Sequence, residues 1–214
     1  MIELWGRKNS YNVQKVLWVL DELKINYAHH DVGSQVGDLE TVEFLAMNPR
    51  ARVPVLIDNG SVIWESNTIV RYLSAAYGAN SLWLDNPLQR SYADRWMDWE
   101  QATLQPDFMD LFWGFYRKSE SKRDGAQIEN SKSQCERHFK MLDGHLKQND
   151  FVAGEAFSMG DIPAATGLYR YFEMGIEVEK PANLMAWYQR LSRREAFQRT
   201  IMTPFDELKG REQY

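Results

Sequence analysis

Short apolar-rich runs, separated by helical or turn signals, predict four strands in the first third of the chain. The runs are IELW at 2–5, YAHHD at 27–31, VPVLI at 53–57 and SVIW at 61–64. The Asn59-Gly60 pair between the last two runs predicts a tight hairpin.

Apolar residues then recur every three or four positions between the first two strands, which predicts a helix with one apolar face that packs on a sheet. These residues are Val13, Val16, Leu17, Leu20 and Leu23. A further helix follows Glu65, with Ile69, Val70, Leu73 and Tyr77 on one face. The predicted order is β-α-β, an irregular segment and β-β-α, so residues 1–77 are expected to form an α/β domain.

Strand signals stop after the turn-rich segment YGANSLWLDNP, and residues 78–87 are predicted to link two domains. From 88 to 214 the patterns have a helical period, so the second domain is expected to be all-helical. Within it, FSMGDI places Ser158 three residues before Asp161, the spacing of a capping box, with Phe157 and Ile162 as its hydrophobic staple. This motif predicts a buried helix start.

Composition narrows the possible functions. The 214 residues are 44% hydrophobic, enough for one large core or two small ones. No run approaches the ~18 apolar residues of a membrane span, and Met1 leads into a strand and not into a signal peptide. With the single cysteine, Cys135, this predicts a cytoplasmic protein. The net charge of −5 argues against nucleic acid as a partner.

Two residue pairs suggest a site for a peptide-like ligand. A cis Val53–Pro54 bond would turn the Val53 backbone outward to pair with an extended peptide, whereas an ordinary trans proline would only close a loop. Glu65 and Ser66 stand where a strand ends and a helix begins, so they can bind an ammonium group and a carboxylate. On their own, these last two residues fit plain helix capping better.

No group of residues predicts a metal site. Cys135 and His138 share a helical face but supply only two ligands, whereas zinc sites want four. His29 and His30 alternate across a strand and point to opposite faces, so they cannot chelate one ion together.

Four motifs together resemble the cytosolic glutathione transferase family, over nearly the whole chain. They are NSYNVQKV at the first helix, NPRARVPVL at 48–56, ESNTIVRYL at 65–73 and FSMGDI in the helical domain. The resemblance is to bacterial serine or asparagine types, similar to the theta, phi and nu classes. It implies a thioredoxin-like domain that binds glutathione as co-substrate, a helical domain that forms the second-substrate wall, and no covalently bound cofactor.

This resemblance gives a role to the polar cluster NSYN at 9–12. Glutathione must be held as its thiolate, because a free thiol has a pKa of about 8.5. A donor at a helix N-terminus stabilises that anion by a hydrogen bond and by the helix dipole. The serine type places its serine six residues before the helix valine, which falls on Ser10, and another bacterial type places an asparagine that falls on Asn12. We favour Ser10 as the catalytic donor, with Asn12 as the second or true donor. Plain capping is the alternative for the residue that does not face the sulfur.

The resemblance also implies that Arg52, Val53, Pro54, Glu65 and Ser66 complete the glutathione site. The family often has Gly-Gln or Gly-Lys before its Val-Pro pair, where this chain has Ala51-Arg52. The segment 32–43 lacks the basic residue that many relatives use for the glycyl carboxylate, a role that Arg52 can take. The tyrosine of the tyrosine type falls on Trp5, and no cysteine occupies the turn, which argues against cysteine-dependent relatives.

The aromatic residues of DFMDLFWGFY exceed what one core stripe needs, and Phe112 and Trp113 are expected to line the second-substrate pocket. The tail 203–214 is expected either to cover that pocket or to fray.

A symmetric homodimer is predicted from side chains that lack an evident place in either core. Arg71 and Tyr72 fall outside their helix's apolar stripe and need another partner. The mixture of Tyr92, Trp96 and Trp99 with Arg90, Arg95 and Glu100 suits an interface better than a core. The family's two-fold dimer would join these helices across subunits, and a monomer is the alternative.

The predicted function is activation of the glutathione thiol for attack on a small hydrophobic electrophile or a peroxide. Two alternatives stay open: glutathione-dependent disulfide reduction, favoured if Asn12 holds the sulfur, and a non-catalytic transferase-like binding protein. The complete cradle of Ser10, Arg52, Val53-Pro54 and Glu65-Ser66 favours the enzyme.

Overall fold

The strands form where the sequence predicts them, to within two residues. A computed structural model describes residues 1–34, 37–79 and 81–212. Its sheet contains β1 (Ile2–Trp5), β2 (Tyr27–His30), β3 (Val55–Asp58) and β4 (Ser61–Trp64) in the order β2-β1-β3-β4. β1 pairs with β2 in parallel and with β3 antiparallel. Asn59 and Gly60 join β3 to β4 with φ of 48° and 83°, which is the geometry of a type I′ hairpin.

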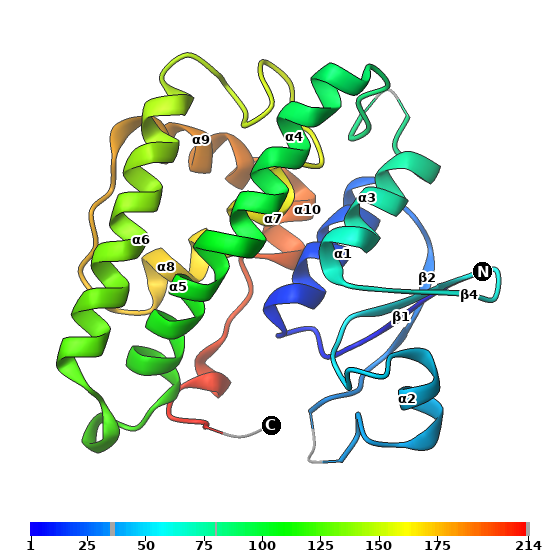
Figure 1. Ribbon diagram of the computed structural model, residues 1–214, viewed down its shortest axis with the longest axis horizontal. Coiled ribbons are helices and arrows are strands. Elements are labelled where there is room, and N and C mark those ends of the chain that lie inside the picture. The colour runs from blue at the N-terminus through cyan, green and yellow to red at the C-terminus, as the bar shows by residue number, and fades with distance from the viewer. Residues whose placement is uncertain (35–36, 80, 213–214) are drawn as a thin grey trace.

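Helix α1 is more deeply buried than its sequence pattern predicts. The helices of this half are α1 (Tyr11–Glu22), α2 (Val42–Met47), within the segment expected to be irregular, and α3 (Ser66–Tyr77). In α1, Gln14, Lys15 and Trp18 are buried along with the predicted apolar stripe, because the helix lies between the sheet and the helical half (Figure 1). The expectation of a single apolar face was therefore wrong.

A long, bent helical run opens the second half of the molecule. It comprises α4 (Pro87–Trp99), a π-helical stretch at Glu100–Leu104, α5 (Gln105–Leu111) and a second π-helical stretch at Phe112–Arg117. Pro106 has no N–H and would crowd the carbonyl four residues earlier in a regular α-helix, and the wider π turn before it removes that conflict. The run lies along α6 (Gly125–Leu146).

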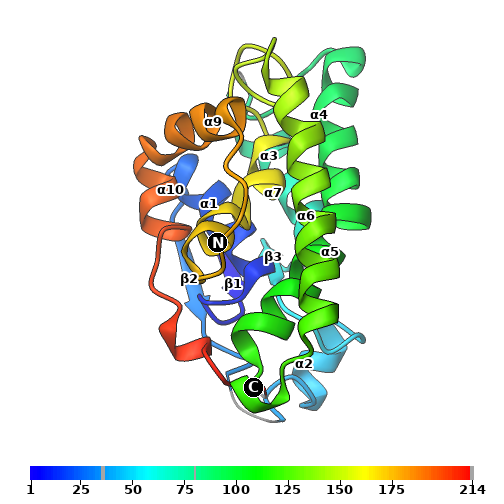
Figure 2. The same ribbon diagram turned by 90° about the vertical axis from the view of Figure 1, so that its left-hand side faces the viewer.

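Short helices complete the second half, which is all-helical as predicted. They are α7 (Asp161–Thr166), α8 (Leu168–Glu173), α9 (Ala182–Ser192) and α10 (Glu195–Thr200), with 3₁₀ turns at Glu120–Lys122 and Asp206–Leu208. Figure 2 shows α7 between α9 and α10 on one side and α4 and α6 on the other. Within the described ranges, no helix combines the length and apolar character that a membrane crossing requires. The linker at 78–87 stays a prediction, and Asn80 within it lies outside the described residues.

The capping box at the start of α7 is built around a buried carboxylate. Asp161 accepts hydrogen bonds from the Ser158 N–H (2.9 Å), the Val152 N–H (2.9 Å) and Trp187 Nε1 (3.0 Å). The Ser158 hydroxyl also donates to it, at 3.3 Å. Burial raises the pKa of Asp161 to about 6, against these hydrogen bonds, which lower it. Phe157 and Ile162 are buried in the surrounding core.

Several residues assigned to a subunit interface find partners within their own chain. Arg71 pairs with Asp94 (2.6 Å) and Asp98 (2.5 Å) on α4, and the Tyr72 hydroxyl donates to Asp58 (2.8 Å). The prediction that both need another partner was therefore wrong. Tyr77, expected on the buried face of α3, is 43% exposed and also donates to Asp58.

Trp96 and Trp99 of α4 pack inside the helical domain. Trp96 is buried and lies edge-on to Trp99, with ring centroids 5.1 Å apart, and against His145 at 4.7 Å. Glu100 is fully buried and paired with Lys15 at 2.8 Å. Tyr92 and Arg95 are exposed and Arg90 and Trp99 are half-buried, so the homodimer stays a prediction.

Replacing Asp161 by alanine is expected to destabilise the protein strongly. Three buried N–H donors would lose their acceptor, so the free energy of unfolding should fall by about 3 kcal/mol. The matched control is Asp124→Ala, which removes the exposed N-cap of α6 and should cost only about 1 kcal/mol. Urea unfolding followed by circular dichroism measures both, and equal losses would contradict the special role of Asp161.

Candidate functional site

A cavity of about 590 Å³ lies between the sheet domain and the helical domain. One side is formed by the loop before α1, the first turn of α1, Gly33 and the segments 37–40 and 50–53. The other side comes from the end of α5, the second π-helical stretch and α8. The lining residues are Arg7, Ser10, Tyr11, Asn12, Gly33, Gly37, Leu39, Glu40, Arg50, Ala51, Arg52, Val53, Met109, Phe112, Trp113 and Arg170.

Ser10 lines this cavity at the N-terminus of α1. It occupies the N-cap position in an extended conformation, but its hydroxyl makes no capping hydrogen bond. Among the described residues that hydroxyl has no other hydrogen-bond partner, so it is available to a ligand. The plain capping role considered for Ser10 is therefore not what its side chain does here.

Asn12 lies two residues further along α1, also at the cavity wall. Its Oδ1 accepts a hydrogen bond from the Ser66 hydroxyl at 3.2 Å, which joins the starts of α1 and α3. With Oδ1 used in this way, the Asn12 amide nitrogen is left as the group that can donate to a ligand. Ser66 is buried and reaches the cavity only through Asn12.

Val53 lies opposite the N-terminus of α1. The Val53–Pro54 bond is cis, as predicted, and Pro54 is buried behind the cavity wall. Within the described part of the chain, neither the N–H nor the C=O of Val53 takes part in a backbone hydrogen bond. The backbone of Gly6 packs closely between Val13 and Val53, which requires a residue without a side chain. Its φ is +147°, and a Cβ there would lie 2.5 Å from Val13 Cγ2 and 3.1 Å from Val53 Cβ.

Glu65 and Arg50 form an ion pair beside the cavity, with Nη1 and Oε1 2.8 Å apart. Glu65 has a φ of 69°, an unusual conformation for a non-glycine residue and one often found at functional sites. Ala51 also has a positive φ, 50°, which explains why a glycine is common at this position in the resembling family. Arg50 was not predicted from the sequence, although it lies within the motif NPRARVPVL.

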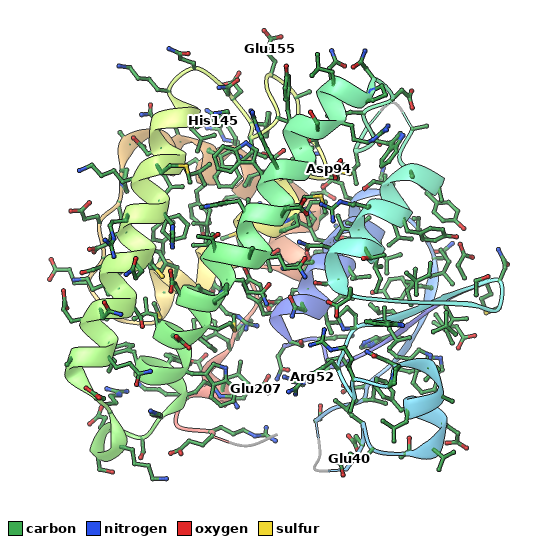
Figure 3. The ribbon with its side chains drawn as sticks, in the orientation of Figure 1. Glu40, Arg52, Asp94, His145, Glu155 and Glu207 are labelled. Carbon is green, nitrogen blue, oxygen red and sulfur yellow. The ribbon has the colours of Figure 1, made fainter. Side chains whose placement is uncertain are left out.

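Arg52 is an exposed cation that lines the cavity. Figure 3 shows its side chain extending from the sheet domain toward the helical domain. Its guanidinium makes no hydrogen bond or ion pair with the described residues. Arg7, which sequence reasoning also missed, donates to the Gly33 carbonyl at 3.1 Å and so holds the loop that borders the cavity. Gln35 and Val36 belong to the segment 32–43, whose sequence has no basic residue, and both lie outside the described residues.

The helical side of the cavity contains both predicted aromatic residues. Phe112 is buried and stacked between Phe108 and Tyr116, with centroids 5.9 and 5.3 Å away, whereas Trp113 is half-buried. Met109 and Arg170 also lie on this side and were not predicted.

Tyr11 lies behind Ser10 in a buried polar cluster. Its hydroxyl donates to Glu100 Oε1 at 2.7 Å, while Lys15 Nζ donates to Glu100 Oε2 and to Gln105 Oε1, both at 2.8 Å. Burial, reinforced by Glu100, raises the pKa of Tyr11 well above its ordinary value, and burial lowers the pKa of Lys15. The Tyr11 hydroxyl is thus a committed donor to Glu100 and not a candidate base.

The described part of the C-terminal tail runs beside the cavity and not over it. Phe205 packs on Phe112 and Tyr116 with centroids 6.1 and 4.9 Å away, and Glu207 accepts from the Asn9 amide at 2.6 Å. None of the tail residues up to Glu212 lines the cavity. The tail is therefore ordered against both domains, and the last two residues, Gln213 and Tyr214, lie outside the described part.

Comparisons with known proteins identify the family to which a chain with this fold and cavity belongs. The N-terminal domain model of glutathione S-transferases matches residues 1–75, and the C-terminal domain model matches residues 104–195. Glutathione S-transferase GstB of Escherichia coli strain K12 is 41% identical over 206 residues, which are 95% of this chain and 99% of that protein. This chain belongs to the cytosolic glutathione transferase family.

Other relatives of this glutathione transferase point the same way. A theta-class glutathione S-transferase from Xanthomonas axonopodis pv. citri, solved with glutathione bound, is 43% identical with a TM-score of 0.91, covering 95% of this chain and 98% of that one. Glutathione S-transferase 3 of Zea mays is 28% identical, covering 94% of this chain and 93% of that protein. Two predictions from the four motifs are therefore confirmed, namely the family and the assignment of the protein as a transferase enzyme.

No cysteine is among the described residues that line the cavity. The described ranges hold no group of three or more histidine, cysteine or acidic side chains that could bind an ion. His138 bonds Asp107 at 2.7 Å, while His29 bonds the Gly6 carbonyl and His30 bonds Glu3. Trp5 stacks on His30 and does not line the cavity. Cys135 is fully buried in the helical core, where burial raises the pKa of its thiol to about 12.

Cys135 of this transferase is therefore expected to be unreactive in the folded state. At about pH 8 a free thiol is substantially ionised, whereas Cys135 stays protonated and covered. A chromogenic aromatic disulfide should label the native protein far more slowly than the same protein in guanidinium chloride. Equal labelling rates would show that the helical core opens or that the thiol is not buried.

Proposed function

We propose that this protein binds glutathione in the interdomain cavity and activates its thiol as the thiolate, with Ser10 as the principal donor. The observation that carries this proposal is the Ser10 hydroxyl, which lines the cavity at the N-terminus of α1 without any hydrogen-bond partner in the described structure. A charge-assisted hydrogen bond and the helix dipole would then act on the same sulfur. The bound glutathione in the Xanthomonas relative supports this choice of ligand.

Each end of glutathione has a matching group in or beside the cavity. The backbone of Val53 is open for pairing with the cysteinyl unit. The second oxygen of Glu65, not used by Arg50, suits the ammonium of the γ-glutamyl end, and the free N–H groups at the start of α3 suit its carboxylate. Arg52 suits the glycyl carboxylate and can bind it with two parallel hydrogen bonds.

The reaction follows from a thiolate held beside an aromatic wall. The thiol proton leaves to solvent, and the sulfur lone pair forms a bond to an electrophilic carbon. In a substitution, the bond from that carbon to a leaving group breaks and the group departs with the electron pair. In an addition, the π bond of an activated double bond breaks and its electron pair moves away from the attacked carbon. Phe112 and Trp113 favour a small hydrophobic electrophile next to the sulfur. The donor at Ser10 stabilises the anion that attacks, which raises its concentration at neutral pH.

Location and assembly are further parts of the proposal. We place the protein in the cytoplasm, where glutathione is abundant in its reduced form and where a single buried cysteine is typical. We also propose a homodimer formed through β4 and α4. The apolar side chains of Val62, Trp64 and Tyr92 support it, since they are 42%, 36% and 37% exposed.

Glutathione bound to the wild-type protein is expected to have a thiol pKa at least about one unit below its free value of about 8.5. Titration of thiolate absorbance in the ultraviolet measures it. Ser10→Ala should lower kcat by about 10- to several hundred-fold with little change in glutathione affinity, because the lost bond acts on the thiolate. Asn12→Ala is the comparison and should do less. The reverse order would make Asn12 the donor and favour disulfide reduction.

Light scattering at micromolar concentration is expected to give twice the monomer mass of 25.1 kDa. Tyr92→Glu should shift the protein toward the monomer, because a charge would be buried at the contact. Met141→Glu is the control, at an apolar position on α6 that is 47% exposed against 37% for Tyr92, and should leave the mass unchanged. A monomer mass for the wild type would refute the dimer.

A further inference from the structure

Arg170 stands out among the cavity residues because it is a buried cation contributed by the helical domain. The residue is only 3% exposed, although it lines the cavity from α8. Its guanidinium lies 5.5 Å from the ring centroid of Phe112 and 5.8 Å from that of Phe205. These rings give the cation a fixed place in a medium of low dielectric, where its field is weakly screened.

Arg170 makes a hydrogen bond to the residue that precedes the proposed catalytic serine. Nη2 donates to the backbone carbonyl of Asn9 at 2.7 Å, and that carbonyl carbon is bonded to the nitrogen of Ser10. The side chain of Asn9 is held as well, by Glu207 at 2.6 Å. The main chain of Asn9 is thus held by the helical domain, and its side chain is held by the C-terminal tail.

The field of Arg170 also reaches the start of α1. Its positive charge lowers the pKa of Tyr11, against the larger effects of burial and Glu100 that raise it. The other charged residues lining the cavity are Arg7, Arg50, Arg52 and Glu40. Arg50 is neutralised by Glu65, and Lys15 and Glu100 behind Tyr11 cancel one another. The tail adds two carboxylates, that of Glu207, which accepts from the Asn9 amide, and that of Asp206, which acts on Tyr116 together with Arg170. Arg170 places its guanidinium on the helical side of the cavity that Ser10 also lines.

We propose that Arg170 is a positioning residue for glutathione activation, which orients Ser10 through the Asn9 carbonyl and stabilises the thiolate by its charge. This inference rests on the proposed function and adds a second source of thiolate stabilisation to it, from the opposite domain. A residue that only fastened the two domains together would affect stability but not the acidity of the bound thiol.

Three substitutions separate the charge from the hydrogen bond. Arg170→Lys keeps the charge, Arg170→Gln keeps an N–H donor without the charge, and Arg170→Met removes both. The matched control is Arg194→Met, since Arg194 also joins the domains, through Glu22 at the far end of α1 and over the ring of Phe157. Folding of each variant is checked by circular dichroism and thermal melting.

The decisive measurement is the pKa of glutathione bound to each variant, from ultraviolet titration. Arg170→Gln and Arg170→Met should raise it by about one unit, which is about a tenfold loss of thiolate below that pKa, and Arg170→Lys should stay close to the wild type. The pH profile of kcat should shift in the same direction, with little change in the KM for glutathione. Arg194→Met should lower the melting temperature and leave the thiol pKa unchanged.

Each failure has its own signature. A wild-type protein that does not lower the thiol pKa would overturn the proposed function itself. A wild type that lowers it, with Arg170→Gln and Arg170→Met unchanged from it, would overturn only the role of Arg170. Should the uncharged variants fail to fold, Arg170→Lys still decides, because a rise of a full unit despite the retained charge would refute charge stabilisation.

Discussion

A buried ion pair between the two domains is the constraint on which the site depends. Lys15 of α1 and Glu100 of the first π-helical stretch are both fully buried and lie 2.8 Å apart. Tyr11 and Gln105 satisfy the remaining hydrogen bonds, so the charges are tolerable in a dry interior. Removing either partner would leave a buried charge without compensation. The pair therefore fixes α1 against the helical domain. Because the cavity lies between the N-terminus of α1 and that domain, the pair also fixes the relative position of the cavity walls.

Most of the fold could be predicted because its signals are local. The Asn59-Gly60 turn and the four strand runs depend on residues adjacent in sequence, and the structure reproduces them. Burial of Lys15 and Gln14 could not be predicted, because it depends on a helical domain that begins about 70 residues later in the chain. The same reason explains the error at Arg71, whose partners Asp94 and Asp98 belong to the next helix and not to another subunit.

The candidate site was predictable as far as its motifs extend. Ser10, Asn12, Arg52, Val53, Phe112 and Trp113 all line one cavity, while Pro54, Glu65 and Ser66 stand just behind it. Arg170 was missed because an isolated arginine on a short helix has no pattern, and only the folded chain places it beside Asn9. Arg50 was missed because the ion pair with Glu65 joins two segments that are separate in the sequence.

Because the cavity is divided between two domains, some of its residues can change during evolution more easily than others, and with them the range of second substrates. Phe112 belongs to a stack with Phe108, Tyr116 and Phe205, and it contacts the cation of Arg170, so changing it would disturb the core as well as the pocket. Met109 is half-buried, and an unbranched thioether adapts its shape at little energetic cost. Substrate range is therefore expected to drift during evolution at Met109, while selection holds Phe112 and the glutathione half of the cavity constant.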